Sequence, residues 1–107
     1  MSKTKKSPKL PYYAVIFTST VTENKDGYEE MSFEMFDLAQ KQPGFIGVES
    51  AREYIGITVS YWESLEDVKN WKKNVKHLVA QKLGKEKWYS AYRVRICLVE
   101  REYEFIN

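Results

Sequence analysis

The stretch from Ile57 to Arg95 most constrains the fold, because its apolar pattern changes from that of a strand to that of a helix and back. Residues 57–63 are rich in β-branched and aromatic side chains, as strands are. Ser64 is a suitable N-cap for a following helix, and Gly84 is a suitable C-terminal stop. Residues 88–105 have the composition of a long last strand. The apolar residues of the helix follow steps of three and four: Val68, Trp71, Val75 and Leu78.

Three more elements are predicted before this stretch. Residues 12–20 are rich in β-branched and aromatic side chains and predict a first strand, apolar on both faces. A helix is expected from about 27 to 41, where Pro43 and Gly44 follow it. Residues 44–53 and 56–63 then form a predicted hairpin, with Gly47 marking a bulge or a close approach. The first helix carries one apolar stripe: Tyr28, Met31, Met35 and Leu38.

The predicted order is β-α-β-β-α-β, which indicates an α+β, ferredoxin-like domain with a four-stranded antiparallel sheet. We expect this single domain to span residues 12–107, after a flexible basic tail over residues 1–11. Two helices cover only one face of such a sheet, yet the second face is also apolar. The simplest cover is a second copy, so a homodimer through the sheet face is predicted. Residues 101–107 are long enough to reach onto that copy.

Composition narrows the class of protein. The chain has 107 residues, 43% of them hydrophobic, which suffices for one core without metal or disulfides. It has no apolar run long enough for a membrane and no secretory signal, and its single cysteine, Cys97, favours a cytoplasmic location. Four of the 17 basic residues lie within residues 1–10, which leaves 13 against 15 acidic residues elsewhere. This balance, and the lack of an RNA-recognition signature at residues 44–48, argues against a nucleic-acid partner.

Few residues can carry chemistry. His77 is the only histidine, which rules out a histidine-rich metal site and predicts no metal centre. It can act as a general base, ligate haem iron, or simply be a polar residue near a helix end. Trp71 points at the sheet, either as core or as the wall of a pocket that Tyr61 or Trp62 also lines. An aromatic wall of this kind suits a flat organic molecule, so a small-molecule ligand is expected.

Several motifs resemble one known family. The segments PGFIGVES, GITVSYWESLEDVKNWKKNVKHLVAQ and WYSAYRVRI, with the closing VEREY, are similar to the antibiotic biosynthesis monooxygenase (ABM) domain family over about residues 12–105. The likeness is greatest to small bacterial stand-alone members. It implies a dimeric α+β barrel with a pocket between sheet and helices in each subunit. Its characterised members include cofactor-independent quinone-forming monooxygenases, haem-degrading monooxygenases and stress-associated proteins.

The resemblance also places residues. Trp62 matches a strand tryptophan of the quinone-forming type, with Thr58 at the position of an asparagine. Trp71 matches a helical tryptophan of the haem-degrading type, with Gln81 near the position of the ligand histidine. Our leading hypothesis is a monooxygenase without a cofactor that acts on an aromatic or quinol-like molecule; the alternatives are a non-catalytic ligand-binding or stress-associated dimer, and a haem-binding protein. The expected catalytic residues are His77, Trp62 and Trp71, and the expected substrate-binding residues are Thr58, Tyr61, Met35, Gln81 and Trp88.

Overall fold

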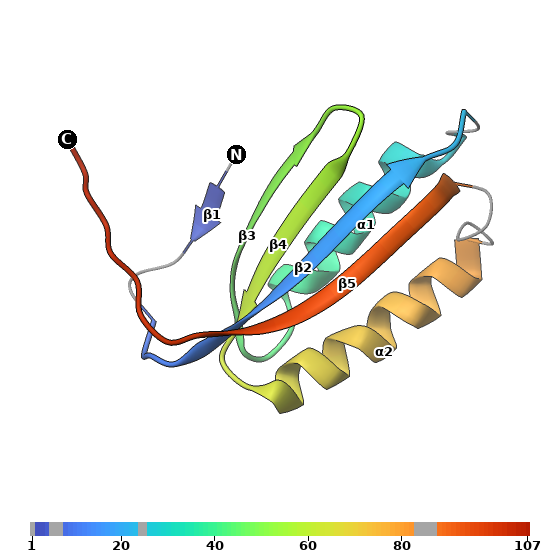
Figure 1. Ribbon diagram of the computed structural model, residues 1–107. Coiled ribbons are helices and arrows are strands. Elements are labelled where there is room, and N and C mark those ends of the chain that lie inside the picture. Colours follow the sequence, from blue (N-terminus) through green and yellow to red (C-terminus); the bar gives the residue numbers. More distant parts are fainter. Residues whose placement is uncertain (1, 5–7, 24–25, 83–87) are drawn as a thin grey trace.

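The computed structural model describes residues 2–4, 8–23, 26–82 and 88–107. From β2 onward the elements follow the predicted β-α-β-β-α-β order, and the α+β, ferredoxin-like prediction is confirmed (Figure 1). The elements are β1 (Ser2–Thr4), β2 (Tyr12–Val21), α1 (Tyr28–Gln40), β3 (Phe45–Arg52), β4 (Gly56–Trp62), α2 (Leu65–Lys82) and β5 (Tyr89–Val99).

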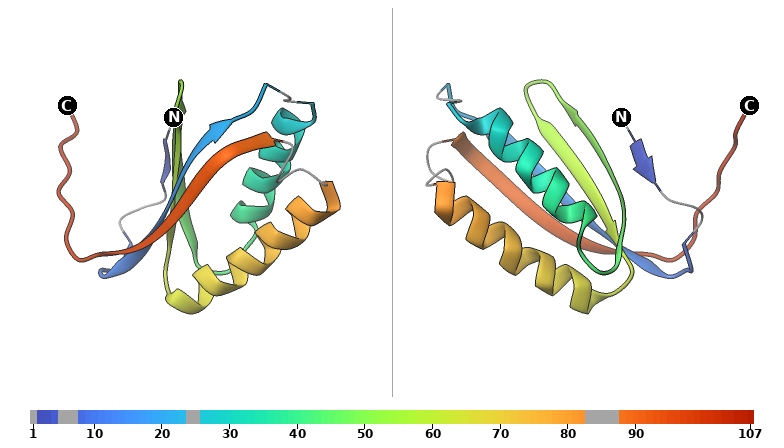
Figure 2. Two further views of the ribbon diagram at one scale, coloured as in Figure 1. Left: turned by 45° about the vertical axis from the view of Figure 1, so that its right-hand side comes forward. Right: turned by 180° about the vertical axis from the view of Figure 1, so that it is seen from behind.

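The sheet is antiparallel throughout, in the order β1-β3-β4-β2-β5. Strands β2 to β5 form the predicted four-stranded sheet, and both helices lie on one side of it (Figure 2). β1 was not predicted: it adds a short edge strand, with Ser2 opposite Glu49 and Thr4 opposite Gly47. The pairing of β3 with β4 shifts register between Phe45 and Gly47, so the irregularity expected at Gly47 is confirmed.

Strand register decides which side chains face the helices, because directly opposed residues of an antiparallel pair share one face. Tyr13 lies opposite Trp62 on β4 and Leu98 on β5, and Trp62 packs with α2. We call this face the helix-facing side and the other the open side. On the helix-facing side lie Tyr13, Val15, Phe17 and Ser19 of β2, Trp62, Ser60, Thr58 and Gly56 of β4, and Leu98, Ile96, Val94 and Tyr92 of β5.

The core lies between the sheet and the two helices. Met31 of α1 is only 1% exposed, and Met35, Leu38 and Val75 pack against the core as partly buried residues. The predicted apolar stripes of both helices are therefore confirmed, except for Leu78, whose side chain lies outside the described part of the chain. The buried cluster itself consists of Ala39, Phe45, Trp62, Val68 and Trp71.

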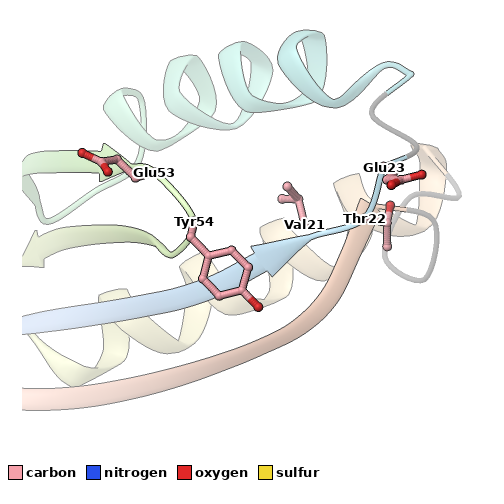
Figure 3. A pocket seen from close by; sticks show the side chains of 5 residues that line it. All are labelled: Val21, Thr22, Glu23, Glu53 and Tyr54. Carbon is pink, nitrogen blue, oxygen red and sulfur yellow. The ribbon is translucent and has the colours of Figure 1, made fainter.

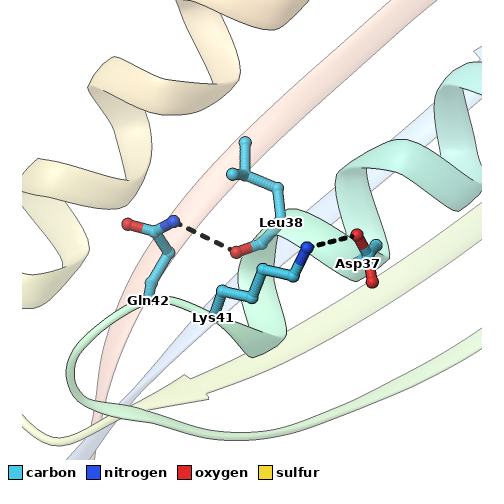
Figure 4. Close-up of polar contacts among 4 residues, drawn as sticks. All are labelled: Asp37, Leu38, Lys41 and Gln42. Atoms are coloured by element: carbon cyan, nitrogen blue, oxygen red, sulfur yellow. Dashed lines mark hydrogen bonds and ion pairs between the residues drawn. The ribbon is translucent and has the colours of Figure 1, made fainter.

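Side-chain contacts close the C-terminal end of α1 (Figure 4). Lys41 Nζ pairs with Asp37 Oδ2 at 3.0 Å, and Gln42 Nε2 donates to the main-chain oxygen of Leu38 at 3.1 Å. That carbonyl, one of the last in the helix, also accepts the main-chain N–H of Lys41 at 3.2 Å. Asn74 Nδ2 in turn donates to Gln42 Oε1 at 3.1 Å. This contact connects α2 to the end of α1 and holds the two helices together at one end.

The last strand is shorter than predicted. β5 ends at Val99, so the expectation of a strand continuing to Phe105 is wrong. Val99 lies opposite Tyr12, the first residue of β2, and beyond it β2 offers no backbone for pairing. Residues 100–107 therefore leave the sheet as an extended arm that projects from the body (Figure 1). Neither α1 nor the described length of α2 is long and apolar enough to cross a membrane.

Candidate functional site

An apolar row on β5 is half exposed although it belongs to the helix-facing side. The helices pack chiefly on other strands, α1 on β3 and α2 on β2 and β4. The row on β5, at the edge of the sheet, is therefore left partly uncovered. Its side chains, which we call the β5 row, are Tyr92 (44% exposed), Val94 (48%), Ile96 (52%) and Leu98 (48%).

Aromatic rings gather where the β5 row meets the start of α1. Tyr89 makes edge contacts with the rings of Phe17, Tyr28 and Tyr92, at centroid distances of 5.4, 5.8 and 5.9 Å. Phe17 also stacks on Tyr92 at 5.6 Å, and Tyr28 meets Trp88 edge-on at 6.1 Å. We call these five residues the aromatic cluster. Rings in such offset and edge geometries attract one another beyond simple burial, so the cluster is a firm surface.

The cluster carries polar groups as well. Trp88 Nε1 donates to the main-chain oxygen of Asp26 at 2.7 Å, which fixes the indole. The hydroxyls of Tyr28 and Tyr89 share a hydrogen bond, and burial, together with Tyr28, raises the pKa of Tyr89 well above its ordinary value. The Tyr89 hydroxyl therefore stays protonated at neutral pH. A tyrosine hydroxyl can donate a hydrogen bond to an oxygen atom of a ligand that lies on the rings.

The two tryptophans expected to be catalytic lie inside the core. Trp62 is fully buried and Trp71 is 9% exposed, and their rings stack at 5.4 Å with an angle of 27°. Trp62 Nε1 donates to Ser60 Oγ at 2.9 Å, which satisfies the buried indole N–H. Met35 packs against the same cluster. The pair therefore fills the core between the sheet and α2, without direct access for a ligand.

The expected substrate-binding residues lie on two sides of the sheet. Thr58 faces the helices, and its Oγ1 bonds Ser50 Oγ at 3.0 Å. Tyr61 lies on the open side, where its hydroxyl donates to Glu49 Oε1 at 2.6 Å and its ring meets the Tyr12 ring. Within one chain, Tyr61 therefore does not share a pocket with Trp62.

The remaining expected residues lie on α2 and at the start of β5. His77 and Gln81 belong to the last turns of α2, and their side chains lie outside the described part of the chain. Trp88 belongs to the aromatic cluster. Among the described residues, no group of three or more His, Cys, Asp or Glu side chains is placed to hold a metal ion.

An open cavity of about 430 Å³ lies near the aromatic cluster, and Figure 3 shows the side chains that line it. It lies between the β3–β4 turn and the end of β2. Val21 is the register partner of Tyr89, and the main-chain N–H of Thr22 donates to the Trp88 oxygen at 2.7 Å. This cavity was not predictable from the sequence, because no lining residue belongs to a recognisable motif. It is lined by Val21, Thr22, Glu23, Glu53 and Tyr54.

Sequence reasoning placed Phe17 and Tyr28 on apolar faces but not in a site. The nearness of Phe17 to Tyr92 could have been found by aligning β2 with β5, since Phe17 pairs with Val94, the next residue after Tyr92 on that face of β5. The position of Arg52, whose guanidinium lies 6.0 Å from the centre of the Tyr28 ring, could not be predicted from the sequence. Its role depends on the register of three strands, which local sequence does not show.

Comparison with known proteins agrees with this architecture. No protein-family model matches the chain. A candidate antibiotic biosynthesis monooxygenase from Nitrosomonas europaea superposes with a TM-score of 0.67 at 13% identity, covering 80% of this chain and 88% of that one. SnoaB of Streptomyces nogalater, a cofactor-independent oxygenase, superposes with a TM-score of 0.64 at 11% identity, covering 91% and 99%.

One relative is much more similar in sequence. The uncharacterized protein YqjZ of Bacillus subtilis is 48% identical over 99 residues, which cover 91% of this chain and 87% of YqjZ. Identity at this level over nearly the whole chain shows common membership, whereas the solved structures, at lower identity, show the fold. The chain therefore belongs to the family of YqjZ and has the fold of the antibiotic biosynthesis monooxygenases.

Proposed function

We propose that this protein is a monooxygenase that oxidises a small phenolic or quinol-like molecule without a cofactor. The observation that carries the proposal is the half-exposed β5 row, which adjoins the aromatic cluster on the helix-facing side. A surface of apolar and aromatic side chains with a few hydroxyls is what a flat aromatic ligand needs. The fold shared with SnoaB, a cofactor-independent oxygenase, supports the same class of chemistry.

The reaction requires no nucleophile from the protein. A phenol that loses its proton becomes an electron-rich anion able to reduce oxygen. One oxygen atom then replaces a ring hydrogen and forms the second carbonyl of a quinone, and the other leaves as water. The substrate itself supplies all the electrons, so no external reductant is needed. The protein has to hold the ring, remove the proton and keep bulk water away.

We assign these tasks to residues as follows. His77 of α2 is the proposed base that takes the phenolic proton. The β5 row holds the rings, Trp88, which is only 2% exposed, supports the aromatic cluster from within, and Thr58 offers a hydroxyl on the same side of the sheet. Trp62 and Trp71 act as positioning residues, because they are buried between the sheet and α2 on the same side of the sheet as this surface. Tyr61 is not assigned to the substrate site, because it lies on the open side of the sheet.

Oxygen uptake by the full chain tests the proposal, with 1-naphthol and anthrones as substrates. We expect equal consumption of oxygen and phenol, with quinone as the product. His77→Ala should lower kcat and remove the dependence of the rate on deprotonation of the base. If compounds of this class bind but none is oxidised, the protein is a ligand-binding protein and the oxygenase proposal falls.

A matched pair of variants checks the location of the site. Ile96 (52% exposed, β5 row) and Leu65 (53% exposed, first turn of α2) are equally exposed but lie on different surfaces. Ile96→Asp places a charge against the bound ring, and we expect kcat/KM to fall about tenfold or more. Leu65→Asp should leave kcat/KM unchanged. Equal effects, or a loss only in Leu65→Asp, would move the site away from β5.

A further inference from the structure

Arg52 lies across the helix-facing side of the sheet, and Gly56 makes this possible. Arg52 pairs with Gly56, Gly56 with Ser19, and Ser19 with Tyr92, so the four residues form one row over four strands. A Cβ atom on Gly56 would come within 2.1 Å of Arg52 Cζ. The missing side chain therefore lets the guanidinium pass over Gly56 to β2.

The guanidinium is anchored at a buried hydroxyl. Its Nη2 donates to Ser19 Oγ, and its Nη1 donates to the main-chain oxygen of Ser19 at 3.5 Å. Ser19 is only 3% exposed. Among the described residues, Arg52 forms no ion pair with a carboxylate, and both of its hydrogen bonds go to neutral oxygens. A guanidinium has five N–H donors in a flat fork, so this cation keeps donors for an anion.

The anchored cation stands at the edge of the aromatic cluster. Its Cζ lies 6.0 Å from the centre of the Tyr28 ring. Beyond Tyr28 follow Tyr89 and the β5 row. Arg52 therefore places a positive charge at this end of the surface, within reach of an aromatic ligand on the rings. The nearby cavity carries Glu23 and Glu53, which disfavour polyanions and leave a single, well-directed anionic group as the match.

We propose that the helix-facing side binds an aromatic monoanion, whose carboxylate or phenolate oxygen pairs with Arg52 while its rings lie on the aromatic cluster and the β5 row. This inference rests on the proposed function, since the same surface would hold the substrate. It adds the charge and the orientation of that substrate. Gly56 and Ser19 act as positioning residues, because they set the place of the guanidinium and do not contact the ligand.

Calorimetric titration of the full chain with 2-naphthoate and 2-naphthamide tests the charge preference. The two probes share ring and size, and neither can be oxidised to a quinone by the proposed route. We expect the wild-type protein to bind naphthoate about ten- to a hundredfold more tightly, the range for hydrogen bonds to a charged group. Arg52→Gln should abolish this preference and leave the Kd of naphthamide nearly unchanged. A titration at high pH with ionised 2-naphthol in place of naphthoate shows whether the site binds a phenolate or a carboxylate more tightly.

Two further variants separate the position of the Arg52 guanidinium from a general effect of charge. Gly56→Ala retains the arginine but blocks its path to Ser19, so it should reduce the preference as Arg52→Gln does. Lys72→Gln removes the same charge from the exposed side of α2 and should leave the preference intact. Circular dichroism of each variant confirms folding. An equal affinity of the wild-type protein for both probes, or a preference that survives both Arg52→Gln and Gly56→Ala, overturns the inference.

Failure of this inference is distinguishable from failure of the oxygenase proposal. If naphthoate binding depends on Arg52 but no phenol is oxidised, the anion site stands and the oxygenase proposal falls. If Arg52→Gln oxidises phenols at the wild-type rate and the wild-type protein binds naphthoate no more tightly than naphthamide, the oxygenase proposal stands and the anion site falls.

Discussion

At the scale of single residues, two glycines share a backbone conformation but differ in their surroundings. Gly27 and Gly44 both have φ of 81°, a region that costs other residues roughly 1–2 kcal/mol. A Cβ atom on Gly44 would lie 2.0 Å from Asp67 Oδ2, inside the carboxylate. The corresponding atom on Gly27 would come no closer than 3.4 Å to Trp88. Only Gly44 therefore combines backbone strain with a collision.

This difference predicts unequal costs for the same substitution. Gly27→Ala should lower the free energy of unfolding by the conformational cost alone, roughly 1–2 kcal/mol. Gly44→Ala should cost about 1–3 kcal/mol more, because Asp67 must move. Urea denaturation at one fixed protein concentration measures both. Equal losses in the two variants would show that Asp67 yields freely and that only the backbone matters.

At the scale of elements, α2 begins at a reciprocal cap. Ser64 Oγ accepts the main-chain N–H of Asp67 at 3.1 Å and donates to Asp67 Oδ2 at 2.7 Å. Glu66 and Asp67 also put negative charge in the first turn, where the helix dipole favours it. The cap fixes where α2 leaves β4, and through Val68 and Trp71 it fixes how the helix lies on the sheet.

Removal of this cap should destabilise the fold without changing it. Ser64→Ala is expected to lower the free energy of unfolding by about 1 kcal/mol, because one N–H of the first turn loses its acceptor. Ser64→Thr keeps a hydroxyl and should cost clearly less. Both are measured by urea denaturation, with the far-ultraviolet dichroism of the native state as the check on helix content. A cost in Ser64→Thr equal to that in Ser64→Ala would contradict the capping role.

Elements were the part of the structure most open to prediction from sequence. Helix periodicity and the Ser64 cap gave α1 and α2, and strand alternation showed that Val94, Ile96 and Leu98 share a face. The end of β5 could not be predicted, because a strand stops where its neighbour stops and that depends on register. The extra strand β1 has no apolar pattern and depends on the exposed edge of β3.

The candidate site was predictable only in outline. The search for aromatic walls led to Trp62 and Trp71, which the structure places in the core, and to Trp88, which it places in the aromatic cluster. Large aromatic side chains are common in cores as well as in pockets, and composition does not separate the two. Arg52 reaches Ser19, 33 residues away in the chain, across a third strand. Such a contact exists only once the sheet is assembled.

At the scale of the whole molecule, the open side of the sheet is not covered by a helix, since both helices lie on the opposite side (Figure 2). Ile57 on this side is 45% exposed, and Ile16 lies between Val59 and Arg95 of the neighbouring strands. Arg93 adds a second positive charge on β5. An apolar sheet face of this kind is stable in water mainly when something covers it.

The C-terminal arm, residues 100–107, indicates what covers the open side of the sheet. Tyr12 donates its hydroxyl proton to Glu102 at 2.7 Å, and burial, with this carboxylate, raises the pKa of Tyr12 to about 12. The contact holds the root of the arm at physiological pH. Beyond it, Tyr103, Phe105 and Ile106 are 87%, 88% and 79% exposed. The acidic, apolar arm complements a sheet face that carries arginines, so we propose a homodimer in which each arm lies on the open side of the other copy.

Removal of the apolar side chains of the arm should therefore weaken the dimer. We expect the double variant Phe105→Ser, Ile106→Ser to raise the Kd for dimerisation at least about tenfold, because burial of one large apolar side chain is worth roughly 1.5–3 kcal/mol. Phe33→Ser is the matched control, since Phe33 is 72% exposed on α1, on the other side of the sheet. Sedimentation velocity over a dilution series gives all three constants. A monomeric wild-type protein at micromolar concentration, or equal constants for the double variant and the wild type, would leave the open side to a partner other than a second copy.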